Sequence, residues 1–145
     1  MIDYQNILKI NLLNVLKDIL GNIKNKGLSG SNHLYITFLT SHPKTKIPNW
    51  IKEKYPEEMT IVIQYEYYDI KINKNDFFIT LSFNDTIATL KIHYESIISF
   101  ADPSANFGLR LKEVKDLKKN NKIIKDKVKR NYEDNIINFS NFKKN

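Results

Sequence analysis

The spacing of apolar and polar residues divides the chain into one helical segment followed by several short strands. In residues 3–20 apolar side chains recur at i, i+4, i+7 and i+11, which is typical of an amphipathic helix. The stripe consists of Leu8, Leu12, Val15 and Ile19, and it is widened by Ile7, Leu16 and Leu20. We expect Asp3 to cap the start of this helix and Gly21 to end it.

The apolar surface of this helix is wider than one small sheet could cover, because Ile10 and Leu13 extend it to a flank. Two interpretations stay open. The helix packs only on its own domain, or it also pairs with a second copy of the chain.

The middle of the chain is rich in β-branched and aromatic residues, interrupted by tight turns. The expected strands are residues 33–40, 58–72, 77–83 and 87–94, with a last short element near 107–111. Residues 25–32 are expected to form a loop, and a short helical turn should precede Pro56. Short strands with tight turns predict a mainly β fold with an N-terminal helix (α+β), built as a small antiparallel barrel or sandwich.

A length of 145 residues with 41% hydrophobic residues suits one domain with one core. The chain has no cysteine, which excludes disulfides and thiolate chemistry. The apolar start is interrupted by Lys9, Asn11, Asn14, Lys17 and Asp18, so it fails as a signal peptide or membrane span. We therefore expect a cytoplasmic protein.

The net charge of +7 is concentrated at the end of the chain. Residues 112–145 hold 11 Lys/Arg and 5 Asp/Glu, whereas residues 1–111 hold 12 and 11. From residue 112 onward the composition is that of a disordered linker. The predicted domain at 1–111 is nearly neutral, which argues against a groove that tracks phosphates.

Candidate catalytic residues do not assemble in the sequence. His33, His42 and His93 are scattered, none has a metal-ligand spacing with acids, and there is no phosphate-binding glycine motif. The sequence therefore predicts no enzyme, no cofactor and no metal site.

The aromatic content of the strands points to a binding surface. Residues 61–70, IVIQYEYYDI, place tyrosines, Gln64 and Glu66 on both faces of an expected strand. Such a strip can line a groove that holds an extended peptide. The rival interpretation is a small Sm-like or OB-like barrel that stacks RNA bases, but no Lys or Arg lies between residues 60 and 70.

Five segments, in order, resemble the α-proteobacterial form of SspB, the stringent starvation protein B family. They are HLYITFLT, YPEEMTIVIQYEYYDI, FFITLSFN, SFADPSANFGLRL and the terminal IINFSNFKK. The resemblance implies an adaptor for the ClpXP protease, which binds the ssrA degradation tag on stalled translation products and delivers tagged proteins to ClpX. It also implies a homodimer through the first helix, here at Leu8, Leu12, Val15 and Ile19.

By the same resemblance, the peptide groove involves Gln64, with Tyr35, Thr37, Tyr65, Tyr67 and Tyr68 as further candidates that could equally belong to the core. Asp102, Pro103, Phe107 and Gly108 match the family's DPS…FG segment, and an architectural role is expected for them. The implied organisation is a tag-binding domain at 1–111, a flexible basic linker at 112–134 and a ClpX-docking peptide at 135–145. The docking contacts would be Ile136, Ile137, Phe139, Phe142, Lys143 and Lys144.

Three features depart from the family pattern at the terminus: Phe139 in place of a usual leucine, the additional Asn145, and the lysine-rich linker. The cargo could also be mainly some protein other than those carrying the ssrA tag. A tail that packs on the body of the domain is the structural alternative to a docking peptide.

Overall fold

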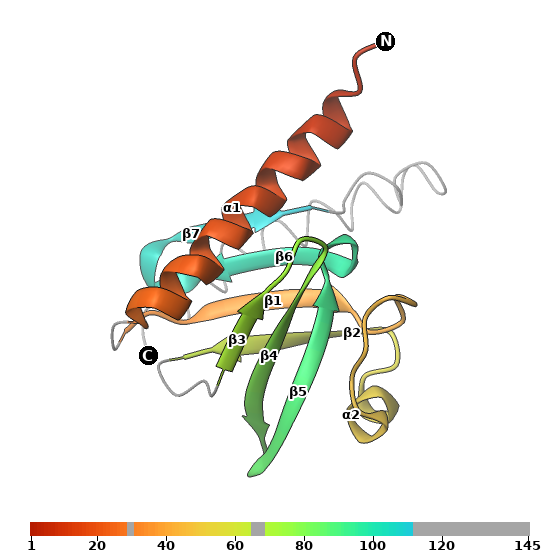
Figure 1. Ribbon diagram of the computed structural model, residues 1–145, viewed down its shortest axis with the longest axis vertical. Coiled ribbons are helices and arrows are strands. Elements are labelled where there is room, and N and C mark those ends of the chain that lie inside the picture. Colours follow the sequence, from red (N-terminus) through yellow and green to blue (C-terminus); the bar gives the residue numbers. More distant parts are fainter. Residues whose placement is uncertain (29–30, 65–68, 112–145) are drawn as a thin grey trace.

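A computed structural model of the 145-residue chain describes residues 1–28, 31–64 and 69–111 (Figure 1). The helices are α1 (Tyr4–Lys26) and α2 (Asn49–Lys54), with 3-10 turns η1 (Tyr94–Ser96) and η2 (Pro103–Ala105). The strands are β1 (Leu34–Leu39), β2 (Glu58–Ile63), β3 (Asp69–Ile72), β4 (Asp76–Phe83), β5 (Thr86–His93), β6 (Ile97–Asp102) and β7 (Phe107–Arg110). The predicted fold class, an N-terminal helix followed by antiparallel strands, is confirmed.

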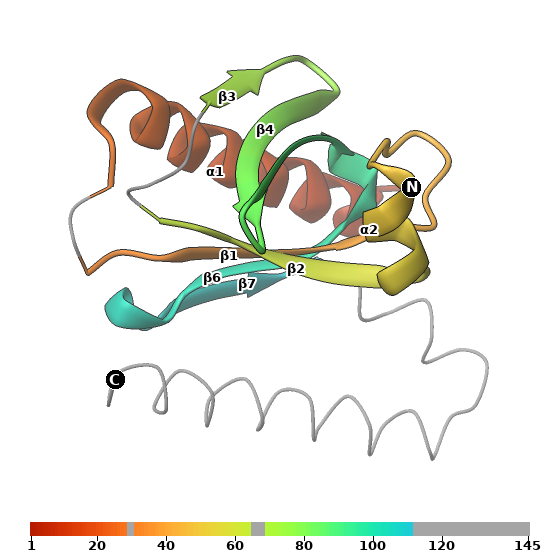
Figure 2. The same cartoon turned by 90° about the horizontal axis from the view of Figure 1, so that it is seen from below.

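The strands form two antiparallel sheets, which we call sheet A and sheet B. Sheet A has the order β2-β1-β6-β7, and sheet B has the order β3-β4-β5. Among the described residues these sheets do not close into a barrel, so the sandwich alternative holds and the barrel alternative does not (Figure 2). The β4–β5 hairpin is closed by Asn84 and Asp85, both at positive φ, as a tight hairpin turn requires.

Both sheets contribute alternate residues to one core. In β1 the buried positions are Leu34, Ile36 and Phe38, so the other side chains face away from the core. Sheet B adds the fully buried Phe77, Ile79 and Leu90. From α1 the buried side chains are Leu16, Leu20 and Ile23, which cover the core beside β3.

The first helix is longer than predicted. Asp3 caps it as expected, since its carboxylate accepts a hydrogen bond from the Asn6 backbone N–H at 3.1 Å. The prediction that Gly21 ends it is wrong, because the apolar stripe continues to Ile23, which is buried in the core. The helix instead ends before Gly27, whose φ of 73° suits glycine.

The prediction of one long strand at 58–72 is also wrong. β2 ends at Ile63 in sheet A and β3 begins at Asp69 in sheet B. Ile63 and Ile70 are both buried, so the chain passes from one sheet to the other while keeping an apolar anchor in each. No helix among the described segments is long and apolar enough to cross a membrane.

Candidate peptide-binding surface

Gln64 directly follows the edge strand of sheet A. Its side chain is exposed, and β2 has β1 as its one neighbouring strand within the described residues. An unpaired strand edge offers backbone N–H and C=O groups to an extended peptide. An exposed carboxamide at the end of that edge can both donate and accept hydrogen bonds.

Tyr35 and Thr37 lie on the face of sheet A that points away from the core. Both are partly buried, and the hydroxyls of Thr37 and Thr60 are hydrogen-bonded across β1 and β2 at 2.7 Å. Burial, and then the negative charge of Asp102, raises the pKa of Tyr35. The structure thus places these two candidates on the outer face of sheet A, outside the core.

The DPS…FG segment has a structural role at one end of sheet A. The Asp102 carboxylate accepts hydrogen bonds from the Asn32 side chain and from the Ser104 backbone N–H, both at 3.0 Å. Phe107 packs against the buried Phe100 with ring centroids 6.1 Å apart. These contacts fix the turn that returns the chain from β6 to β7.

Several predicted site residues lie outside the described residues. These are Tyr65, Tyr67 and Tyr68, together with the docking-peptide candidates Ile136, Ile137, Phe139, Phe142, Lys143 and Lys144.

The first half of α1 presents apolar side chains to solvent. This part of the helix projects beyond both sheets (Figure 1). The exposed fractions are 59% for Leu8 and 37% for Val15, and Leu12 and Ile19 are partly buried. The exposed set also includes Tyr4, Ile7 and Ile10. The four predicted dimer residues therefore lie beside the buried stripe of the helix rather than within it.

A groove of about 520 Å³ runs between the second half of α1 and the end of sheet A. Its apolar lining includes Val15, Ile19, Leu34 and Phe107, and Lys26 and Asp102 also line it. Two of the predicted dimer residues thus line a concave surface continuous with the exposed part of the helix.

A second exposed apolar site lies at the tip of the β4–β5 hairpin. Trp50 on α2 is 46% exposed and meets Phe83 edge to face, with ring centroids 6.4 Å apart. Trp50 carries no signal in the sequence, because its contact with Phe83 bridges two distant elements.

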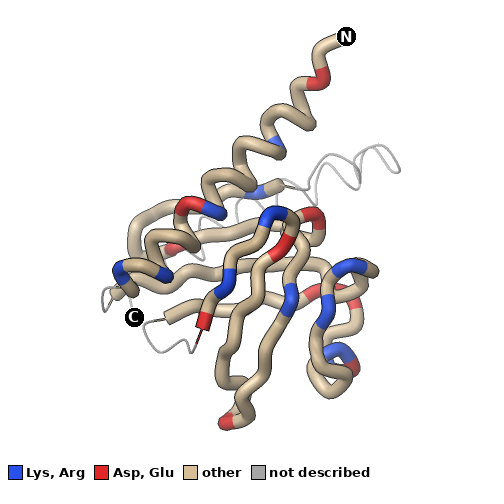
Figure 3. Tube along the Cα trace, in the orientation of Figure 1, with Lys and Arg blue, Asp and Glu red and all other residues tan. Residues whose placement is uncertain are grey.

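Charged side chains of both signs are interleaved over the described part of the chain (Figure 3). This distribution agrees with the near balance of 12 Lys/Arg and 11 Asp/Glu in residues 1–111. It offers no continuous basic stripe of the kind that follows a nucleic-acid backbone.

Two of the histidines that are scattered along the sequence meet in the structure. His42, His93 and Glu95 bring potential ligand atoms within 4.8 Å of one another, although 51 residues separate the two histidines. Their hydrogen bonds do not suit a metal, however. Nδ1 of His42 accepts the Lys44 backbone N–H and Nδ1 of His93 accepts the Glu95 backbone N–H, so each neutral ring carries its proton on Nε2. A metal on Nε2 would require the proton on Nδ1, facing these donors.

Comparison with known proteins identifies one family. The family model described as stringent starvation protein B matches residues 8–140, which is most of the chain. A search of curated proteins finds no match.

Proposed function

The chain belongs to the stringent starvation protein B (SspB) family, and on this basis we propose that it binds ssrA-tagged proteins and tethers them to the ClpXP protease. The family is one of substrate adaptors rather than enzymes, and membership is consistent with a protease-adaptor role. We further propose that the chain is of the α-proteobacterial type within this family.

The observation that best supports tag binding is the position of Gln64. It is an exposed carboxamide at the end of β2, the edge strand of sheet A. In the proposed complex an extended tag lies beside β2, its backbone groups pair with the strand edge, and Gln64 fixes its position. Tyr35 and Thr37, with Tyr65, Tyr67 and Tyr68, are proposed as further contacts.

Delivery requires a second contact, which we assign to the end of the chain. Ile136, Ile137, Phe139 and Phe142 would provide apolar contacts with ClpX, and Lys143 and Lys144 would add positive charge. Residues 112–134 would serve as the tether. A short flexible link gives a local concentration on the order of millimolar, so two weak contacts suffice for delivery. At about 3.4 Å per extended residue, such a linker can reach well beyond the radius of the domain.

The exposed apolar surface of α1 supports a homodimer within this proposal. Leu8, Leu12, Val15 and Ile19 would pack against a second copy, which removes their apolar surface from water. A dimer would present two tails to one protease and raise the avidity of the tether.

Fluorescence anisotropy of a labelled ssrA-tag peptide, titrated with the full-length chain, tests the tag contact. Saturable binding that Gln64→Ala weakens by tenfold or more is the expected result, while Gln5→Ala, the same change at an exposed residue of α1, leaves the affinity unchanged. Absence of peptide binding, combined with single-stranded RNA binding that collapses at high salt, would favour the RNA-binding alternative.

A further inference from the structure

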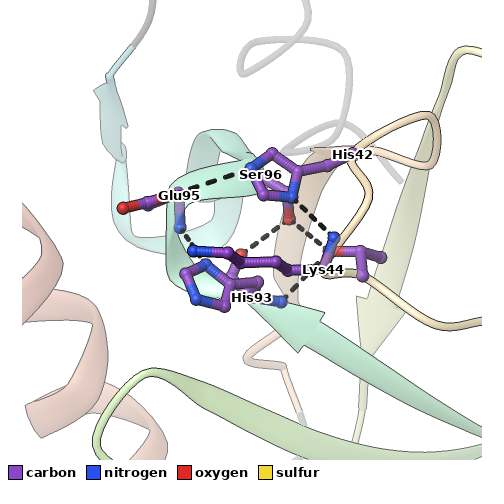
Figure 4. Close-up of polar contacts among 6 residues, drawn as sticks. His42, Lys44, His93, Glu95 and Ser96 are labelled. Carbon is purple, nitrogen blue, oxygen red and sulfur yellow. Dashed lines mark hydrogen bonds and ion pairs between the residues drawn. The ribbon is translucent and has the colours of Figure 1, made fainter.

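A closed ring of hydrogen bonds joins the loop after β1 to the end of β5 (Figure 4). The His93 backbone N–H donates to the Thr45 hydroxyl at 3.1 Å, and the Thr45 hydroxyl donates to the Ser96 hydroxyl at 2.8 Å. The Ser96 hydroxyl donates to the His93 carbonyl at 2.7 Å. Thr45 and Ser96 are both buried, so this ring fastens residues 41–47 to the corner between β5 and β6.

The same junction carries a short backbone pairing. Lys46 and Lys91 exchange two backbone hydrogen bonds, of 2.8 and 2.9 Å. The loop that leads into α2 is therefore held on the edge strand of sheet B by backbone and side-chain bonds together.

Each of the two histidines at this junction acts as the acceptor of a tight turn. The Lys44 backbone N–H donates to His42 Nδ1, and the Glu95 backbone N–H donates to His93 Nδ1, each at 3.1 Å. Both turns span two residues, the geometry that Asn and Asp side chains ordinarily provide. Asp102 makes the same turn with the Ser104 N–H. A carboxylate remains an acceptor near neutral pH, whereas an imidazole accepts at Nδ1 only while that nitrogen is unprotonated.

We propose that protonation of His42 and His93 in mild acid loosens residues 41–47. The two histidines, together with the two turns whose backbone N–H groups donate to them, are called the histidine latch. Protonation places an N–H on Nδ1 directly against a backbone N–H donor, so each protonated ring loses its turn. The ring centroids are 5.5 Å apart, and a second positive charge is therefore opposed by the first.

Charged groups around the two rings also act on their protonation. The Glu95 carboxylate lies 3.8 Å from His42 Nε2, but the Glu95 side chain is 56% exposed, so water screens its attraction for an imidazolium. Asp76 is opposite His93 on β4 and already accepts a hydrogen bond from Asn73 and pairs with Lys91. Lys44 and Lys46 add positive charge on the loop itself.

The sign of the pH dependence follows from this geometry. The unfolded chain takes up protons on these imidazoles without losing any turn, so protonation favours the unfolded chain. The contribution of the latch is complete while both rings are unprotonated and is lost as they take up protons in mild acid.

The test uses Asn as a matched substitution, because its side-chain oxygen can accept the same N–H two residues later but does not titrate. Thermal unfolding of the full-length chain is followed at pH 7.5 and pH 5.5, for the wild type and for His42→Asn combined with His93→Asn. We expect similar midpoints at pH 7.5 and, on going to pH 5.5, a fall in the wild type larger than that of the variant by roughly 4 °C or more. An equal fall in both proteins would overturn the proposal.

A measurement on the wild type removes any dependence on how the variant folds. Long-range proton–nitrogen NMR of the histidine rings at pH 7.5 should show His42 and His93 with the proton on Nε2. The Lys44 and Glu95 amide resonances should move together with ring titration. Ring protons on Nδ1, or a rise in the unfolding midpoint on addition of Zn²⁺, would show that the rings are not turn acceptors and would contradict the latch. This inference does not depend on tag binding.

Discussion

The ammonium group of Lys17 lies 4.7 Å from the centre of the Tyr94 ring and also donates a hydrogen bond of 3.1 Å to the Lys74 carbonyl. Through these contacts α1 is joined both to the core and to the β3–β4 turn. A cation over an aromatic face contributes about 0.5–1 kcal/mol at exposed sites.

Tyr94 should make the domain sensitive to alkali. Burial, and then the negative charge of Asp76, raises the pKa of Tyr94 to about 12 from its ordinary value of 10.0. The unfolded chain therefore releases this proton first, so stability is unchanged below about pH 10 and falls as the pH rises toward 12. Urea unfolding of the wild type and Tyr94→Phe across pH 9–12 measures the effect, and the variant should show the smaller fall. Parallel curves would contradict this assignment.

Two glycines of α1 should respond in opposite directions to replacement by alanine. Gly21 lies inside the helix, and a methyl group there would meet no atom within 4 Å, so Gly21→Ala should stabilise the domain by about 0.5–1 kcal/mol. Gly27 has a φ of 73°, so Gly27→Ala should destabilise it. Chemical denaturation of both variants checks this pair. A gain at Gly27 or a loss at Gly21 would show that the helix does not end as described.

The exposed and buried residues of α1 should separate assembly from stability. Leu8→Asp combined with Val15→Asp removes exposed apolar surface, and we expect it to convert a dimer to a monomer in sedimentation velocity while the domain stays folded and loses only the stability that the dimer contacts supply. Leu16 is fully buried, and Leu16→Ala should cost about 2–5 kcal/mol of folding free energy. A wild-type chain that sediments as a monomer at all concentrations would remove the dimer from the proposal.

The elements of this fold follow well from local sequence patterns, whereas their long-range relationships do not. Alternation of apolar residues predicted β1, β4 and β5 close to their observed bounds, and the DPS…FG segment, for which an architectural role was expected, contains the turn before β7. The expectation that glycine ends the helix failed at Gly21, because burial of Ile23 in the core stabilises the helix by more than one glycine destabilises it. The strand pattern from Glu58 to Ile72 could not show a change of sheet, since both halves remain apolar.

At the candidate site, too, local features can be inferred from the sequence and long-range contacts cannot. The resemblance pointed to Gln64 as a groove residue, but its exposed position just after the edge strand β2 did not follow from a pattern that predicted one long strand at 58–72. The meeting of His42 with His93 carried no sequence signal, because it depends on the Lys46–Lys91 pairing between distant segments. The contact of Trp50 with Phe83 likewise depends on the position of α2 beside the β4–β5 hairpin.

The most direct test of the adaptor proposal is reconstituted degradation of an ssrA-tagged reporter by ClpXP at a reporter concentration well below saturation. The full-length chain should accelerate degradation, and Gln64→Ala or removal of residues 135–145 should each abolish the acceleration while Gln5→Ala retains it. If Gln64→Ala abolishes the acceleration and removal of residues 135–145 does not, tag binding is required for delivery and tethering by the tail is not. A full-length chain that binds neither the tag nor ClpX and leaves the degradation rate unchanged would contradict the central claim.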